Sequence, residues 1–375
     1  MAHAYTPGLK VLHATTIKKS RILPLKGEVL VNDGDLVTPE TIVCSTNLPG
    51  NVQMVNVANL LNIEPAEVAD MMKKSIGDVV QPGDLLAESA GIFGMFKSKV
   101  EVPTAGTIEH ISNTTGQVVI REAPIPVQVD AYISGRVCEV TPEEGVVIES
   151  KAAMIQGIFG IGGETRGELK IVVKDRESEL MPEDIKPEHK GKILVAGSYV
   201  SLAAYRKAAS VGAAGLVTGG FDYNQLKDIL GYTLGVAITG SEELTTTMVV
   251  TEGFGRINMA DRTFDLLKEH DGDFASINGA TQIRAGVIRP EIVITLPADT
   301  KESTKADDIS AGVSDGSLVR VIRAPYFGRL GRIKSLPPEL QQMESETMVR
   351  IAVIEFEKGD VKTVPRANLE MVETD

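Results

Sequence analysis

The chain has 375 residues and a formal net charge of −13 at pH 7, with 51 acidic and 38 basic residues. The length predicts about two to four domains, and the acidic balance argues against general affinity for nucleic acid, because long-range repulsion from phosphate opposes association. Apolar residues make up 43% but aromatic residues only 4%, so the cores must be built from Val, Ile, Leu and Ala, which favours β-barrels and α/β layers.

The cysteines and the N-terminal residues indicate a cellular compartment. Cys44 and Cys138 are far apart and have no metal-type spacing, so a disulfide framework is not expected. The N-terminal stretch has no apolar core of signal-peptide length, and no apolar run approaches the roughly 18 residues of a membrane span. We therefore expect a soluble, cytoplasmic protein that does not contact the membrane.

Residues 1–173 are rich in Val, Gly and Pro, with short apolar runs broken by turn residues, which predicts a β-rich region. Two phrases nearly repeat: GEVLVNDGDLV at 27–37 and IGDVVQPGDLL at 76–86. In each, a short strand leads to a turn containing Gly and Asp and then to a second apolar strand. In the segment between the two phrases, the spacing of the apolar residues predicts a helix over 57–74.

The second phrase, followed by VPTAGTI at 102–108, resembles the barrel-sandwich hybrid fold of biotinyl and lipoyl carrier domains. Carrier domains present a modified lysine at a tight hairpin tip, in a Met-Lys-Met or Asp-Lys context. Lys97 and Lys99 lie in the corresponding stretch, but neither has that context and the hairpin is longer. The resemblance therefore implies a structural barrel over residues 27–125, without attached biotin or lipoate.

The sequence GIFGIGGETRG at 157–167 has a glycine spacing that suggests a phosphate loop. A P-loop ends in Gly-Lys-Ser/Thr, and a Rossmann fingerprint opens a helix. Here GGETRG follows, and the next residues alternate like a strand. We therefore predict a β-hairpin that turns at Gly162 and Gly163. The charged segment 174–192, with two prolines, is expected to be a linker.

Between residues 192 and 298, apolar strands alternate with helices and short loops, which predicts an α/β domain with a mainly parallel sheet. Ser201 is expected to cap its first helix and Gly212 to end it. Four predicted strands end in small polar residues, which should share one rim because ligands bind outside the carboxyl ends of parallel strands. There, N–H groups and hydroxyls could bind a small anion. The rim residues are Ser198, Thr218, Gly219, Gly220, Thr239, Gly240, Glu242, Thr251, Glu252 and Gly253.

The alternative is that these glycines and threonines only make tight turns. No catalytic residue is predicted, because the five histidines are scattered and none lies on the rim. No HExxH, CxxC or EF-hand spacing occurs, so neither a metal nor a cofactor is expected. Arg284 and Arg289 interrupt an apolar stretch, so we expect them either to pair with Glu242, Glu252 or Glu291 or to bind an anion.

After a polar linker at 299–314, residues 315–375 predict a small β module. Its segment SLVRVIRAPYFGRLGRIKSL, 317–336, has five basic residues and no acidic one. Residues 316–333, with the Gly-x-x-Gly turn of Gly328 and Gly331, resemble the KOW motif. The resemblance implies an SH3-like barrel of the kind found in ribosomal proteins and transcription elongation factors, which binds RNA or proteins. Tyr326 and Phe327 lie at the predicted loop, where an aromatic side chain could stack on a base. The candidate contact residues are Arg320, Arg323, Tyr326, Phe327, Arg329, Arg332 and Lys334.

The alternative is that these arginines pair with acidic residues of the module, such as Glu355 and Glu357, or with another domain. The preferred hypothesis is a non-catalytic binding or scaffolding factor that contacts RNA or a nucleoprotein or protein complex through the KOW-like barrel. The second is an enzyme or enzyme-complex subunit that binds a phosphorylated small molecule or nucleotide at the strand ends. The third is a homo-oligomer in which the basic segment meets an acidic neighbour.

Overall fold

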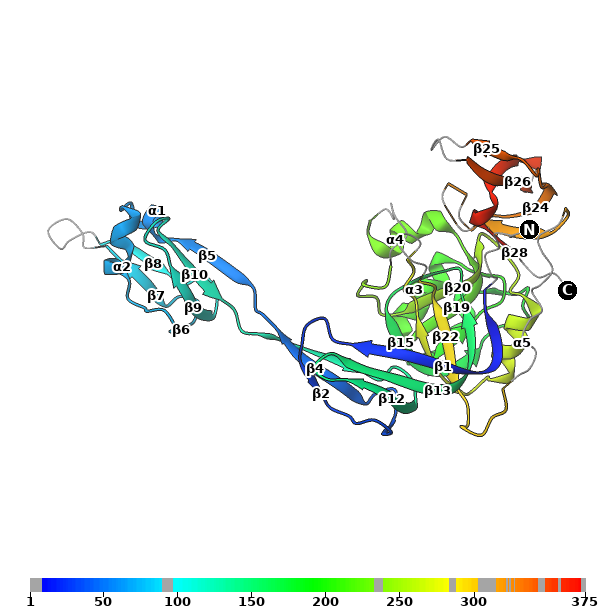
Figure 1. Cartoon of the computed structure of the whole chain (residues 1–375), viewed down its shortest axis with the longest axis horizontal. Helices are drawn as coiled ribbons and strands as arrows, with labels where there is room; N and C mark the ends of the chain where they lie inside the picture. The colour runs from blue at the N-terminus through cyan, green and yellow to red at the C-terminus, as the bar shows by residue number, and fades with distance from the viewer. Residues whose placement is uncertain are drawn as a thin grey trace.

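The computed structural model describes most of the chain. The residues outside the described part are 1–8, 90–96, 233–238, 283–287, 303–314, 322, 324, 327, 343–347, 357–358 and 372–375. The described part is mostly β, with several sheets, one of which curls into a half-barrel, which agrees with the β part of the expected multidomain α/β plus β fold. The molecule is elongated, with a small β unit at one end and a larger body at the other (Figure 1).

The unit at the far end comprises residues 51–122, and we call it the distal unit. Its main sheet has the order β5-β10-β9-β6, and β7 pairs with β8. Its elements are β5 (Val52–Asn56), α1 (Val57–Leu61), η1 (Pro65–Glu67), α2 (Val68–Met71), β6 (Val79–Val80), β7 (Leu85–Glu88), β8 (Lys99–Glu101), β9 (Gly106–Ile111) and β10 (Gln117–Arg121). The helix expected over 57–74 is broken, because Asn62 has a φ of 53° and Pro65 starts a new turn. The hydrophobic core of this unit comes entirely from its own segment.

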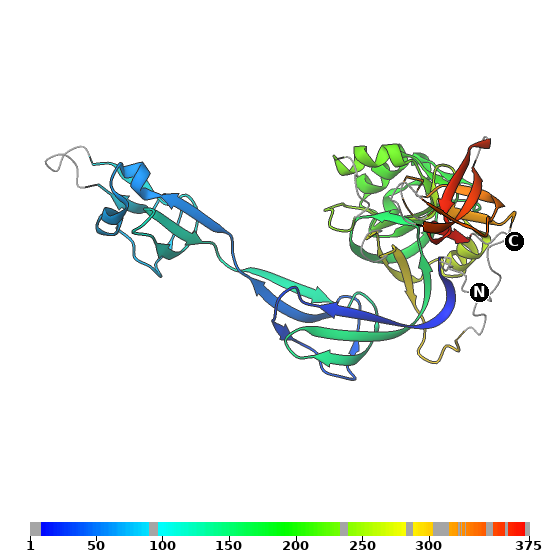
Figure 2. The same cartoon turned by 45° about the horizontal axis from the view of Figure 1, so that its top comes forward.

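A proximal unit connects the distal unit to the body, and β4 and β11 form the ribbon between them (Figure 2). Its elements are β1 (Val11–Ile22), β2 (Glu28–Val29), β3 (Leu36–Val37), β4 (Ile42–Leu48), β11 (Ile125–Asp130), β12 (Gly135–Thr141) and β13 (Gly145–Gln156). It has a separate core that includes Val43, Ile133 and Ile148. The two near-repeat phrases therefore lie in different units, 27–37 in the proximal one and 76–86 in the distal one.

The body is built on β14 (Phe159–Ile161), β15 (Glu164–Ile171), β17 (Ile193–Val195), β19 (Gly215–Phe221), β20 (Thr247–Phe254), β21 (Phe274–Asn278) and β22 (Glu291–Thr295). These strands continue into β13, β12 and β3 of the proximal unit as one described sheet, with the order β14-β20-β19-β17-β15-β21-β22-β13-β12-β3. The run β15-β17-β19-β20 is parallel. The other described pairings in this sheet are antiparallel.

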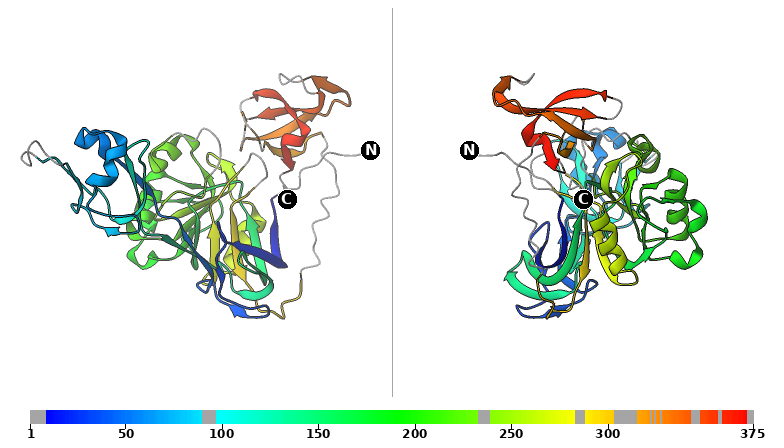
Figure 3. Two further views of the ribbon diagram at one scale, coloured as in Figure 1. Left: turned by 60° about the vertical axis from the view of Figure 1, so that its left-hand side comes forward. Right: turned by 90° about the vertical axis from the view of Figure 1, so that its right-hand side faces the viewer.

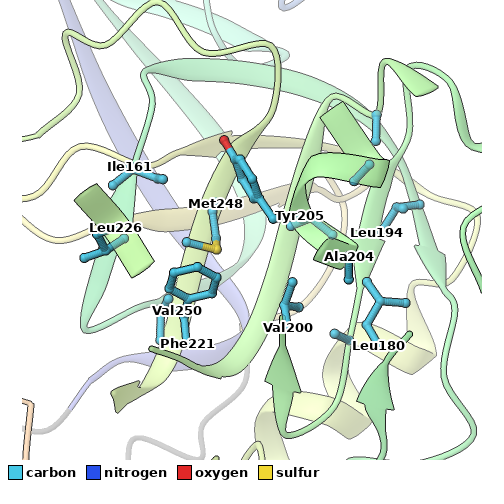
Figure 4. Packing of buried hydrophobic residues seen from close by; sticks show 14 of the residues in the cluster. Ile161, Leu180, Leu194, Val200, Ala204, Tyr205, Phe221, Leu226, Met248 and Val250 are labelled. Carbon is cyan, nitrogen blue, oxygen red and sulfur yellow. The ribbon is translucent and has the colours of Figure 1, made fainter. Parts of the chain in front are cut away.

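Helices cover both faces of the parallel strands, so these strands are buried on both sides. The helices are α3 (Leu202–Val211), α4 (Leu226–Leu230) and α5 (Asp261–Glu269). Leu194, Leu216 and Met248 pack with residues of α3 and α4, where Tyr205 lies against the strands (Figure 4). Val217 and Val249 point to the other face and pack with α5.

Of two local predictions for the body, the one for the ends of α3 is confirmed and the one for a hairpin is wrong. Ser201 accepts a hydrogen bond from the Ala204 N–H at 3.1 Å and Gly212 ends α3 with a φ of 81°, so both ends of α3 are confirmed. The hairpin at Gly162 and Gly163 is wrong, because β14 pairs with β20 whereas β15 pairs with β17 and β21. The strands flanking the turn thus diverge to different places in the sheet.

The segment 174–192 is packed on the body instead of forming a free linker. Leu180 and Ile185 are buried in the core beneath α3. The short elements here are β16 (Glu179–Leu180), η2 (Pro182–Asp184) and η3 (Pro187–His189); β16 pairs with β18 (Tyr199–Val200), and η4 (Tyr223–Gln225) precedes α4. The segment packs on the body because burying apolar side chains such as Leu180 and Ile185 removes apolar surface from water.

Residues 315–371 form a C-terminal module at the edge of the body (Figure 3). Its sheet has the order β25-β26-β24-β23-β28, with β27 on β26. The elements are β23 (Leu318–Val321), β24 (Leu330–Ser335), β25 (Leu340–Gln342), β26 (Met348–Phe356), β27 (Val361–Pro365), η6 (Arg366–Asn368) and β28 (Leu369–Met371). Val319, Val321 and Ile333 are buried, as the alternation predicts. In the described part of the chain, no helix has the length and apolar character needed to cross a membrane.

Candidate functional site

Arg320, the first basic residue of the segment 317–336, is buried and does not face solvent. It lies opposite Glu370 on the β23–β28 pair, with Arg320 Nη1 3.4 Å from Glu370 Oε2. Its Nη2 donates to Glu252 Oε2 at 3.0 Å. Since Glu252 belongs to β20, Arg320 joins the C-terminal module to the body. Its assignment as a surface contact residue is therefore corrected: a buried arginine needs carboxylate partners, and the fold supplies two.

Arg289 completes a buried cluster of two arginines and two glutamates. Its Nη2 lies 3.4 Å from Glu370 Oε1, and the Ala260 N–H donates to Glu252 Oε1 at 3.1 Å. Arg320 Nε and Glu370 Oε1 have no hydrogen-bond partner among the described residues. Burial raises the pKa of Glu370, against the opposing effect of Arg320 and Arg289, and burial lowers the pKa of Arg289. The charges balance, but the hydrogen bonding is incomplete.

Three further basic residues of the segment also have partners inside the module. Arg329 Nη2 donates to Asp360 Oδ2 at 3.1 Å, and its guanidinium lies 4.1 Å from the centre of the Phe356 ring. Arg332 Nη1 donates to the Gly316 carbonyl at 3.2 Å, while its side chain stays exposed. Lys334 lies 3.7 Å from Glu355, an exposed and weak pair. The expectation was that arginines pair with Glu355 and Glu357, but the partner of Glu355 is Lys334, and Glu357 lies outside the described residues.

The remaining candidates of the segment differ in exposure. Tyr326 is half-buried and its ring lies 5.7 Å from the ring of Phe356, so one of its faces is already occupied within the module. Arg323 is exposed and makes no ion pair with any described residue. Phe327 lies outside the described residues. The segment therefore does not form the single, unpaired basic surface that an RNA site would use.

Seven of the ten rim residues do meet at the carboxyl ends of β17, β19 and β20. The parallel pairing places Thr218 beside Val250 and Gly220 beside Gly253. The hydroxyls bond inward, because Thr251 Oγ1 donates to the Thr218 carbonyl and Ser198 Oγ donates to the Glu177 carbonyl. The seven are Ser198, Thr218, Gly219, Gly220, Thr251, Glu252 and Gly253.

The glycines at this end allow close packing of backbone. A Cβ on Gly219 would overlap the Ile257 carbonyl oxygen, and one on Gly220 would overlap that of Gly255. A Cβ on Gly253 would lie 2.7 Å from the Gly328 carbonyl oxygen of the C-terminal module. Chain segments therefore fill the space that an anion would need, which supports the tight-turn alternative at these positions.

Thr239, Gly240 and Glu242 lie at the opposite, amino end of the parallel strands. Thr239 Oγ1 donates to the Gly160 carbonyl at 2.7 Å. The N–H groups of Gly162 and Gly240 donate to Glu242 Oε2 at 3.1 and 2.7 Å. The predicted single rim is thus divided in two: residue 239 follows no strand parallel to β20 in the described part, so the rule for carboxyl ends does not apply to it.

A charged network between β1 and β15 was not anticipated from sequence. Arg21 donates through both Nη atoms to the Glu164 carboxylate at 2.7 Å, and Arg166 Nη2 donates to Asp130 Oδ2 at 2.6 Å. Nearby, Tyr132 is buried at a φ of 65°, and burial raises its pKa. The only sequence signal was charge at alternate positions of β1, which places the side chains on one face. This network attaches the proximal unit to the body.

The histidines that contact other polar groups in the described part of the chain do so in isolated pairs. His189 Nδ1 accepts from the Lys186 N–H, whereas His270 Nδ1 lies 2.8 Å from Asp273. Among the described residues, no group of three or more His, Cys, Asp or Glu side chains could hold a metal ion. In comparisons with known proteins, no family model matches the chain and no curated protein matches it significantly.

Proposed function

We propose that the chain is a non-catalytic binding and scaffolding factor, which contacts a protein complex through the distal unit. The observation that carries the proposal is a unit with its own core, held away from the body on a two-stranded ribbon (Figure 2). Such placement separates a contact surface from the body, and domains with independent cores are the usual way to do this.

One face of the distal sheet supports a protein partner. Val52 and Met54 of β5 are exposed, as is Val79 of β6, and cross-strand pairs place them on the same face through Arg121 and Thr107. The opposite face is the buried core of the unit. Exposed apolar residues gathered on one face are typical of a protein-binding surface.

RNA is the less favoured partner. Arg320 is buried and Arg329 is paired with Asp360, so Arg323, Arg332 and Lys334 remain as the candidate contacts of the segment 317–336, and Arg350 is a further exposed cation of the described module. With a net charge of −13 on the chain, these few exposed cations give little of the backbone neutralisation on which RNA affinity rests. The expected RNA contact through this module is therefore replaced by the distal contact in our proposal.

We further infer the identity of the modules. The near-repeat phrase in β6 and β7 supports a barrel-sandwich-like distal unit. The parallel run β15-β17-β19-β20 with helices on both faces supports an α/β domain in the centre. The turn at Gly328 between β23 and β24, and the core of Val319, Ile333 and Ile354, support an SH3-like barrel of the KOW type.

Native mass measurement of the chain purified under mild conditions from its source cells tests the function. Met54→Asp combined with Val79→Asp should reduce the assembled mass to that of the chain alone. Leu36→Asp, at a residue 77% exposed in the proximal unit, is the matched control and should keep the assembly. An assembly unchanged by the distal variants would exclude this contact face, and a chain that is always alone would exclude the function.

A filter-binding series with mixed-sequence RNA at low and high salt tests the alternative. We expect no affinity that depends on Arg323 and Arg332. Salt-sensitive binding that weakens in Arg323→Ala and Arg332→Ala would show RNA to be the partner instead.

A further inference from the structure

The turn between β14 and β15 and the segment after residue 238 together hold a carboxylate. Gly162 and Gly240 donate their N–H groups to the same oxygen, Glu242 Oε2. The Tyr232 hydroxyl donates to the other oxygen, Oε1, at 3.4 Å. Three donors from three separate segments thus converge on one anionic group. We call Gly162, Gly240 and Tyr232 the cradle.

The cradle binds its anion without a cation. No described residue forms an ion pair with Glu242, so its charge is compensated by N–H and O–H dipoles. Converging backbone N–H groups are the means by which glycine-rich turns hold phosphate and other anions. The glycine pattern at 157–167 therefore contributes one N–H group, that of Gly162, to the cradle, although it lacks the Lys and Ser/Thr of a P-loop.

Both glycines are needed for this geometry. Gly162 has a φ of 80° and Gly240 a φ of 112°, conformations that residues with a Cβ rarely adopt. A Cβ on Gly162 would lie 2.8 Å from Thr247 Oγ1, and one on Gly240 would lie 2.5 Å from the Cβ of Ala280. The two N–H groups are held in place by the turn and by packing, so they would keep their direction if Glu242 left.

The occupant can be exchanged with solvent. Glu242 is half-buried and Tyr232 is 49% exposed, whereas the hydroxyls of Thr239 and Thr281 beneath them are buried in bonds to backbone carbonyls. Moving the Glu242 side chain out would expose a carboxylate that water solvates well, without opening the core.

We propose that the cradle binds the oxyanion group of a small ligand, a phosphoryl group or a carboxylate, and that Glu242 is an internal competitor which the ligand displaces. This site goes beyond the proposed scaffolding function and does not depend on it. It also differs from the carboxyl-end rim, where backbone segments fill the space next to the glycines.

Isothermal titration of the full chain with sodium phosphate, pyrophosphate and succinate, at constant ionic strength set with NaCl, tests the proposal. In Glu242→Gln, at least one of these anions should bind about tenfold or more tightly than in the wild type, because a charged competitor has become neutral. Glu243→Gln removes the same charge from the exposed neighbouring residue and should behave as the wild type. The phosphate and succinate titrations distinguish the two oxyanion classes.

Two variants in the Glu242→Gln background locate the site. Gly162→Ala should abolish binding, and Tyr232→Phe, which retains the ring, should weaken it several-fold through loss of one donor. If Gly162→Ala does not fold, Tyr232→Phe alone decides. The proposal is overturned if Glu242→Gln binds none of the three anions, if it binds them no more tightly than Glu243→Gln, or if Tyr232→Phe leaves the affinity unchanged.

Discussion

The two ends of the parallel strands β17, β19 and β20 are completed in different ways. At the carboxyl end, where ligands of such sheets usually bind, glycines face carbonyl oxygens and the C-terminal module covers Glu252 and Gly253. At the amino end, two glycine N–H groups face a carboxylate that solvent can reach. Glycine thus serves two purposes in one sheet: close approach of backbone at one end, and presentation of donors at the other.

The largest expected effect is at the covered end. Arg320→Ala leaves Glu252 and Glu370 buried together with only Arg289 nearby, and removing one partner of a buried ion pair typically costs about 3–5 kcal/mol. Urea unfolding, followed together with hydrogen exchange in residues 250–260 and 318–321, should show the loss. Arg332→Ala is the control and should change the free energy of unfolding by less than about 0.5 kcal/mol. Equal effects of the two variants would mean that Arg320 does not hold the module to the body.

A pair of glycine substitutions compares the two ends directly. Gly220→Ala forces a Cβ against the Gly255 carbonyl and should cost about 1–3 kcal/mol, as overpacking of a tight contact does. Gly163→Ala is at the amino end, where the nearest atom to its Cβ would be the Gly240 carbonyl oxygen at 3.1 Å, so the cost should be smaller. Thermal unfolding of both variants gives the order, and the reverse order would contradict the assignment of close packing to the carboxyl end.

The pH dependence of stability should reveal the Glu370 carboxyl. Burial raises its pKa above the ordinary value of 4.5, so its contribution to stability is complete below 4.5 and is lost as pH rises through the raised value. Glu370→Gln is neutral throughout, so its free energy of unfolding relative to that of the wild type should increase as the pH rises from 4 to 7. Parallel pH profiles of the two proteins would show that the pKa of Glu370 is not raised.

The smallest effect is expected at the exposed pair of Lys334 and Glu355. Both side chains are about half exposed and their charged atoms are 3.7 Å apart, so Lys334→Ala should cost at most about 0.5 kcal/mol. Urea unfolding at low and high salt checks this value. A loss comparable to that of Arg320→Ala would show that exposure does not separate the strong from the weak pairs of the basic segment.

Local chemistry made several features predictable. The cap at Ser201 and the left-handed Gly212 follow from short-range hydrogen bonding, and the buried Val319, Val321 and Ile333 follow from alternation. The meeting of Thr218, Gly220, Thr251 and Gly253 follows from the rule for parallel strands. In each case the deciding interaction is within the element or its immediate neighbour.

Sequence by itself determined those strands and helices whose ends and buried faces follow from periodicity and capping, such as α3 and β23, because these effects act over a few residues. The tertiary structure alone decided what the charged and glycine residues do. Arg320 is buried because Glu252, 68 positions away, meets it from another module. Glu242 occupies the cradle because β14 and β15 leave the Gly162 turn for different strands. Charges and backbone donors act through partners that are distant in sequence, and only the folded chain brings those partners together.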